Sequence, residues 1–167
     1  KINNFKNLLI SVGASGNSLN LYSFFFTKYL DLLKSEFDNI YCDPILIHSL
    51  RSDSSLIIAD YSAEMYQKID IAIVRPGLGT LVDLLSYKCI PICVYEENFE
   101  MINNGQIIEQ KKLGFDYGII DKRKNHLSYL LNKVKGELNI IQNNILSLNM
   151  RGLEESVSVL TKQIKMD

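Results

Sequence analysis

The fold of this chain can be inferred outward from one stretch, Asp70-Ile-Ala-Ile-Val74-Arg75-Pro-Gly-Leu-Gly-Thr80-Leu-Val-Asp83. The stretch opens on a nearly continuous apolar run, as in strands that are buried on both faces of a helix-covered parallel sheet. Small residues follow, and an apolar helical pattern then runs from about Leu78 to Tyr87. We therefore predict a buried strand, a glycine-rich turn and a helix at the centre of the chain.

The same alternation of strand and helix continues on both sides of this stretch. Apolar runs predict further strands at 8–12, 39–47, 56–59, 91–94 and 117–120. Helical patterns occupy 19–34, 63–67, 102–112, 122–134, 138–148 and 153–165. Gly114 is expected to cap the 102–112 helix, and Gly136 and Gly152 are expected to separate the last three helices. Pro44 lies inside the predicted 39–47 strand, although proline is rare in strand interiors.

Strands that alternate with helices predict an α/β fold, a doubly wound, Rossmann-like parallel sheet of about six strands. Helices would cover both faces of the sheet, and further helices would end the chain. In such sheets ligands bind beyond the carboxyl ends of the strands, near the point where the strand order reverses. The 167 residues suit a single domain, and 47% hydrophobic residues can build a sizeable core.

Charge and apolar runs argue against two kinds of partner. The chain has 18 basic and 19 acidic residues, whereas nucleic-acid-binding domains usually carry a clear basic excess. No stretch approaches the roughly 20 apolar residues of a membrane span. We therefore expect no nucleic-acid partner and no transmembrane segment. The chain starts without Met and without the long apolar segment of a signal peptide, so we expect a piece excised from a longer protein.

The cysteines and histidines do not form a metal-binding pattern. Cys42, Cys89 and Cys93 include no Cys-x-x-Cys pair, and the only histidines are His48 and His126. We therefore expect no metal site. The cysteines are interpreted as small buried thiols in a reducing, cytoplasmic compartment.

Three polar loops follow predicted strands. The first, Gly13-Ala-Ser-Gly-Asn-Ser18, precedes a helix, so its glycines, its hydroxyls and the helix N-terminus can hold a pyrophosphate. A structural turn with a helix cap fits the same residues equally well. The second loop, Arg75 to Asp83, places Thr80 in the first turn of a helix and Asp83 one turn later. A carboxylate there can accept from both hydroxyls of a ribose, or it can complement the helix dipole.

The third loop, Glu96 to Gln106, opens a helix with acidic and amide side chains that suit sugar hydroxyls. Taken in isolation, a solvated acidic loop is the simpler interpretation of the same residues. The three loops become more informative when they are considered together.

Together these segments resemble the C-terminal, donor-binding domain of GT-B glycosyltransferases. The family most similar is that of the peptidoglycan N-acetylglucosaminyltransferase that makes lipid II. The corresponding segments here are Val12-Gly-Ala-Ser-Gly16, Tyr61-Ser-Ala-Glu-Met65, Ile69 to Val74, Gly77-Leu-Gly-Thr80 with Asp83, Lys88-Cys-Ile-Pro91, and Glu100 to Gly105 with Leu113-Gly114. The chain departs from the family where Asp83 replaces the more usual Glu and where the sugar-contacting loop lacks Gln-Gln or Glu-Gln.

The resemblance implies a role for each matched position. The donor diphosphate would contact Gly13, Ser15, Gly16, Gly77, Gly79 and Thr80. Asp83 would bind the ribose. A uracil-type base would contact Tyr61, Ser62, Met65 and Arg75, and the transferred sugar would contact Glu100, Asn103 and Asn104. The resemblance implies no metal and no cofactor, and the nucleotide-sugar donor is a substrate.

The resemblance also implies what the whole protein does. Residues 1–167 would be a single nucleotide-sugar-binding domain, the C-terminal half of a two-domain hexosyltransferase that moves a sugar from UDP to an acceptor hydroxyl. The N-terminal half would bind the acceptor and carry the catalytic base, so this chain alone would be inactive. The enzyme would be cytoplasmic, would build a cell-envelope glycan, and would reach the inner face of the membrane through its other half.

Three alternatives remain open at this point. The chain could be the donor-binding subunit of a glycosyltransferase that is divided between two proteins. It could be half of a nucleotide-sugar hydrolase or epimerase, because such enzymes share the donor loops. A nucleotide-binding regulatory module is the third, and the Arg75 to Asp83 segment makes it the least favoured.

Overall fold

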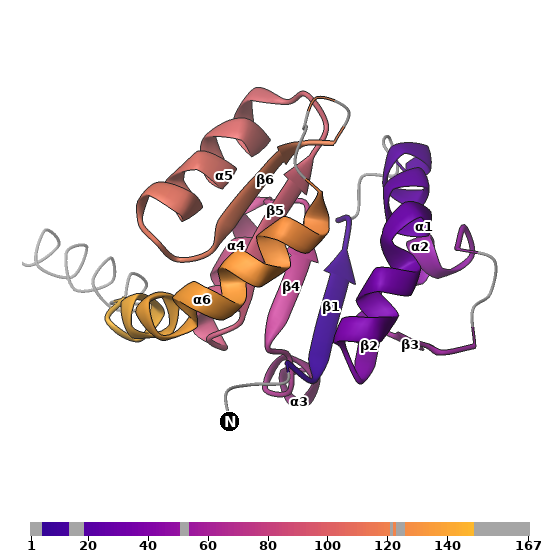
Figure 1. The fold of residues 1–167 in the computed structure, drawn as a ribbon, viewed down its shortest axis with the longest axis horizontal. Coiled ribbons are helices and arrows are strands. Elements are labelled where there is room, and N and C mark those ends of the chain that lie inside the picture. The colour runs from indigo at the N-terminus through magenta and orange to yellow at the C-terminus, as the bar shows by residue number, and fades with distance from the viewer. Residues whose placement is uncertain (1–4, 14–18, 51–53, 121, 123–125, 149–167) are drawn as a thin grey trace, which may run out of the picture.

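The computed structural model describes residues 5–13, 19–50, 54–120, 122 and 126–148 (Figure 1). The strands are β1 (Asn7–Ser11), β2 (Asn39–Cys42), β3 (Leu56–Ile58), β4 (Ile71–Val74), β5 (Ile90–Tyr95) and β6 (Phe115–Ile119). The helices are α1 (Leu19–Glu36), α2 (Pro44–Ile47), α3 (Ala63–Tyr66), α4 (Leu78–Ser86), α5 (Phe99–Gln110) and α6 (Leu127–Leu146).

The strands form one sheet in the order β3-β2-β1-β4-β5-β6, and every pairing is parallel. At its centre, Leu9 of β1 lies opposite Tyr41 of β2 on one side and Ala72 of β4 on the other. The chain builds outward from β1 to β3, returns to the centre at β4, and builds outward again to β6. The strand order therefore reverses between β1 and β4, which confirms the predicted doubly wound, Rossmann-like sheet.

Two apolar layers hold helices on opposite faces of the sheet. α1 and α6 pack on the face that carries Leu8 and Ile10, whereas α3 and α4 pack on the face that carries Leu9. Neighbouring residues of a strand point to opposite faces, so β1 serves both layers, and all three side chains are fully buried. Figure 1 shows α6 crossing the near face of the sheet and α4 behind it. Helices on both faces are thus confirmed.

The predicted strand at 39–47 is correct only in its first half. β2 ends at Cys42, and Asp43 then caps α2 by accepting a hydrogen bond from the backbone N–H of Ile45 at 3.0 Å. Pro44 occupies the first position of this helix, where its missing N–H costs nothing and its fixed φ is already helical. Asp-Pro is therefore a helix start here, not a strand interruption.

The predicted break at Gly136 is wrong. α6 continues through this glycine, and its apolar face on the sheet is buried on both sides of it, at Val134 and Leu138. A glycine inside a helix costs only about 1 kcal/mol relative to alanine, which this packing outweighs. The predicted helix at 153–165 and the predicted break at Gly152 lie outside the described residues.

Gly114 does not cap α5. The helix ends at Gln110, and the connection to β6 passes through Lys112 at a φ of 51°. Gly114 instead lies directly against β5: an added Cβ would overlap the carbonyl oxygen of Pro91 and lie 3.0 Å from the side chain of Ile108. Close approach between β5 and the start of β6, not helix termination, requires glycine at this position.

The three cysteines are all buried and free. Burial raises the pKa of Cys42 and of Cys89 to about 12, and it raises the pKa of Cys93 further. Because the thiolate is the reactive form, we expect the native protein to resist an aromatic disulfide reagent at pH 8 and the denatured protein to label quickly. Fast labelling of any thiol in the native state would contradict this assignment of the cysteines to the core.

Candidate functional site

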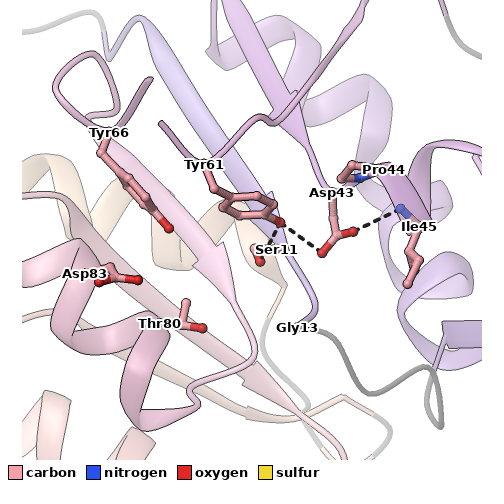
Figure 2. A pocket seen from close by; sticks show the side chains of 9 residues that line it. All are labelled: Ser11, Gly13, Asp43, Pro44, Ile45, Tyr61, Tyr66, Thr80 and Asp83. Atoms are coloured by element: carbon pink, nitrogen blue, oxygen red, sulfur yellow. Dashed lines mark hydrogen bonds between the residues drawn. The ribbon is translucent and has the colours of Figure 1, made fainter. Parts of the chain in front are cut away.

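A pocket of about 480 Å³ lies at the point where the strand order reverses. It opens beyond the carboxyl ends of β1, β2 and β4, where ligands of doubly wound sheets bind. The lining residues, drawn in Figure 2, are Ser11, Gly13, Asp43, Pro44, Ile45, Tyr61, Tyr66, Thr80 and Asp83. They come from both halves of the sheet, and four of them were predicted as site residues: Gly13, Tyr61, Thr80 and Asp83.

One wall of the pocket is a closed hydrogen-bond network. The Tyr61 hydroxyl donates to Oδ2 of Asp43 at 3.0 Å and lies 3.1 Å from Oγ of Ser11 (Figure 2). Asp43 and Ser11 are 7% and 4% exposed, so these interactions satisfy polar groups that would otherwise be costly to bury. Burial is also the main reason why the pKa of Tyr61 is raised, so the phenol remains protonated. The network fixes the Tyr61 ring beside the pocket opening.

Tyr61 has an unusual backbone. Its φ is 55°, in the left-handed region of backbone conformation that residues other than glycine and asparagine seldom adopt. Ser62 follows as the N-cap of α3 and accepts from the backbone N–H of Met65 at 3.1 Å, while Met65 itself is buried in the core. Of the three neighbours predicted to contact a base, only Tyr61 therefore presents a side chain to the pocket.

The opposite wall is the start of α4. Gly77 is the N-cap residue, and it has no side chain that could accept a hydrogen bond from the backbone N–H groups in the first turn of α4. Thr80 and Asp83 line the pocket from the first two turns. Figure 2 shows their oxygens facing the pocket, and no described side chain forms a hydrogen bond with either one. This wall therefore combines a hydroxyl, a carboxylate and the positive end of a helix dipole.

Arg75 lies outside the pocket lining because it is bound to Glu96. Its Nε and Nη2 donate to Oε1 of Glu96 at 2.9 and 2.7 Å, and the hydroxyl of Tyr22 donates to Oε2 at 2.8 Å. Burial alone would raise the pKa of Glu96, but the hydrogen bonds from Arg75 and Tyr22 outweigh it and hold that pKa below its ordinary value. The ion pair joins the turn after β4 to the end of β5.

The residues predicted to contact the sugar lie on α5, outside the pocket lining. α5 begins at Phe99, earlier than predicted, because Asn98 accepts from the backbone N–H of Met101. Glu100 and Asn103 are exposed in its first turns. Asn104 donates from Nδ2 to the carbonyl oxygen of Pro76 at 2.8 Å and so ties α5 to the turn before α4. Ser15 and Gly16 lie outside the described residues.

Asp43, Ser11 and Tyr66 are the polar lining residues that the sequence interpretation missed. Two of them could have been found, because Ser11 ends β1 and Asp43 directly follows β2, and carboxyl ends of neighbouring parallel strands share one edge. Tyr66 gave no such signal, since its place depends on how its ring stacks on Tyr87 at the end of α4. Within the described residues no group of three His, Cys, Asp or Glu side chains is placed to hold a metal, and no helix there is long and apolar enough to cross a bilayer.

Fold and site together define a Rossmann-like α/β domain with a ligand pocket at the reversal of strand order. No protein-family model and no curated protein sequence matches the chain. Solved structures do match, including the glycosyltransferase SnogD from Streptomyces nogalater, with a TM-score of 0.60 and 13% identity over 92% of this chain. The glycotransferase of kitacinnamycin matches 95% of this chain with a TM-score of 0.61 and 12% identity.

A third similar structure is SsfS6, a glycosyltransferase of Streptomyces sp. SF2575 in complex with thymidine diphosphate. It matches 93% of this chain with a TM-score of 0.56 and 12% identity. The chain spans only 42–43% of the length of these three proteins. At such identities the likeness concerns the fold: this chain folds like a little under half of a glycosyltransferase.

Proposed function

We propose that the chain is the nucleotide-sugar donor-binding domain of a GT-B glycosyltransferase that transfers a sugar to an acceptor hydroxyl. The observation that carries the proposal is the pocket in which Thr80, Asp83 and the start of α4 face Tyr61 across the reversal of strand order. Its volume, about 480 Å³, falls within the range of small-molecule sites. The fold shared with three glycosyltransferases, one of them in complex with thymidine diphosphate, supports the same assignment.

The donor is held without a metal in this proposal. The start of α4, with Gly77, Gly79 and Thr80, takes up the diphosphate charge together with the loop that begins at Gly13. Asp83 binds the ribose hydroxyls, and the Tyr61 ring packs against the base. The exposed first turns of α5 then offer Glu100 and Asn103 to the transferred sugar.

The finer features of the function are proposed from the family resemblance. The donor is a UDP-linked hexose, and the enzyme belongs to cytoplasmic cell-envelope glycan synthesis of the lipid II type. A second domain or subunit binds the acceptor and supplies the catalytic base. Closure of that partner over the pocket excludes water and completes the site, so this chain alone binds donor without turning it over.

Calorimetric titration of the chain with UDP, UMP, GDP and TDP tests the proposal. We expect selective binding of UDP, weakened in Asp83→Ala by about 1–3 kcal/mol, the scale for losing a charged hydrogen-bond partner. Asp31→Ala is the matched control, because Asp31 is an exposed carboxylate on α1 outside the pocket lining, and its loss should leave the affinity unchanged.

The outcomes separate the parts of the proposal. Binding of another nucleotide that also depends on Asp83 would keep the donor site and replace uridine. Binding that is equal in Asp83→Ala and the parent chain would remove the ribose role. A folded chain that binds none of the four nucleotides would contradict the proposal that this domain binds donor by itself.

A further inference from the structure

The polar groups of the pocket fall into two sets. Ser11, Asp43 and Tyr61 bind one another and complete one wall. The side-chain oxygens of Tyr66, Thr80 and Asp83 face the same cavity, and no hydrogen bond joins them to the other residues drawn in Figure 2. No other residue that the structure describes forms a hydrogen bond with these oxygens either. The second set is therefore the part of the wall that is open to a ligand. Tyr66 is its unassigned member.

Tyr66 is the least expected of the three because it is nearly buried, with only 6% of its surface exposed. Its ring is stacked on the ring of Tyr87, with centroids 5.2 Å apart and planes at 10°. The ring centroid of Tyr66 also lies 6.4 Å from that of Tyr61, and these two rings are tilted by 49°. This packing fixes the direction of the hydroxyl, which Figure 2 shows pointing into the cavity on the side of Asp83 and Thr80. The hydroxyl itself opens onto the cavity, because no side-chain nitrogen or oxygen of the described residues is buried without a hydrogen-bond partner. Its hydrogen-bond partner therefore comes from whatever fills the cavity.

The neighbourhood of Tyr66 limits what that partner can be. Burial, and next the charge of Asp83, raise the pKa of Tyr66 to about 12, so the phenol is a hydrogen-bond donor at neutral pH. Asp83 beside it is an acceptor only. A phosphate would meet the repulsion of Asp83 at this position. A pair of adjacent hydroxyls can donate to the carboxylate and at the same time accept from the phenol.

We propose that Tyr66 is a ligand-contacting residue that donates its phenolic hydrogen to the vicinal diol of the donor's ribose while Asp83 accepts from that diol. The inference rests on the proposed function and extends it by naming a second residue that forms hydrogen bonds with the ribose. It predicts that the site distinguishes ribonucleotides from deoxyribonucleotides through a donor–acceptor pair and not through the carboxylate alone.

The test combines Tyr66→Phe with UDP, 2′-deoxy-UDP and 3′-deoxy-UDP in calorimetric titrations. Loss of one neutral hydrogen bond should weaken UDP binding roughly 2- to 12-fold in Tyr66→Phe. The same variant should bind one of the two deoxy nucleotides as well as the parent chain does, because the hydroxyl that Tyr66 contacts is then absent. Phenylalanine keeps the ring stack, and a thermal melt checks that the variant is folded.

Tyr87→Phe is the matched control, since Tyr87 belongs to the same stack but does not line the pocket. Its affinity for UDP should equal that of the parent chain. Equal UDP affinity in Tyr66→Phe and the parent, an equal loss for all three nucleotides, or a parent chain that prefers 2′-deoxy-UDP would overturn the inference and leave the donor site in place. Failure of the parent chain to bind any nucleotide would instead overturn the proposed function, and the inference with it.

Discussion

Gly114→Ala is expected to destabilise the protein by about 3 kcal/mol, the upper end of what overpacking of a core usually costs. The new Cβ would overlap the backbone carbonyl oxygen of Pro91 and come within 2.8 Å of its Cγ and 3.0 Å of Cγ2 of Ile108. A backbone atom cannot move aside as a flexible side chain can, so relief requires β5 or the start of β6 to shift. Urea denaturation followed by circular dichroism measures the change in the free energy of unfolding.

Gly136→Ala provides the matched control, because the same methyl group is added at an exposed site. Nothing lies within 4 Å of the added Cβ, and Gly136 is in the middle of α6. Alanine should therefore stabilise the protein by about 0.5–1 kcal/mol through helix propensity. Equal effects at the two positions would contradict the close approach between Pro91 and Gly114.

Glu96→Gln is expected to destabilise the protein by about 2 kcal/mol at pH 7, because it removes the charge that accepts hydrogen bonds from Arg75 and Tyr22. Glu97→Gln is the neighbouring control. The Glu97 side chain is 66% exposed and, among the residues that the structure describes, pairs only with the exposed Lys122, so its loss should cost less than about 1 kcal/mol. The free energy of unfolding of the three chains gives the comparison.

The contribution of Glu96 to the free energy of unfolding should also depend on pH. The pKa of Glu96 in the folded chain lies below its ordinary value of 4.5, so the unfolded chain takes up the proton first. The stabilisation is therefore complete above about pH 4.5 and is lost as the pH falls through the folded-state pKa. The stability difference between the parent chain and Glu96→Gln should shrink over this acid range. A difference that is constant from pH 7 to the acid range would show that the Glu96 charge is not involved.

Regular patterns in the sequence were sufficient to predict the sheet. The apolar run of β4 and the helical pattern of α4 repeat along the chain, and parallel order follows from strands that alternate with helices. The errors arose where one local hydrogen bond or one packing contact decides the structure. Asp43 caps a helix at Pro44, and the apolar face of α6 continues past Gly136. Neither effect is visible in hydrophobic periodicity.

The candidate site was partly predictable for the same reason. Thr80 and Asp83 were found because both follow directly from a strand, a turn and the first turns of a helix. Arg75 was predicted to contact the base of the nucleotide, but its guanidinium pairs with Glu96. These residues are 21 positions apart, and spacing alone does not reveal their contact. The direction of the Tyr66 side chain depends on the stacking of its ring on Tyr87, 21 positions along the chain, so its place in the pocket could be recognised only from the structure.

The central place of β1 has a consequence for the order of assembly. β1 needs β2 on one edge and β4 on the other, and Leu8 pairs with Ile71, which is far along the chain. During synthesis from the N-terminus, β1 therefore keeps an unpaired edge until β4 has left the ribosome, and no hairpin can cover it because the pairings of this sheet are parallel. Non-local parallel pairing of this kind is slow. We therefore expect the joining of the two half-sheets at β1 and β4 to be a slow step of folding, and the same step creates the pocket.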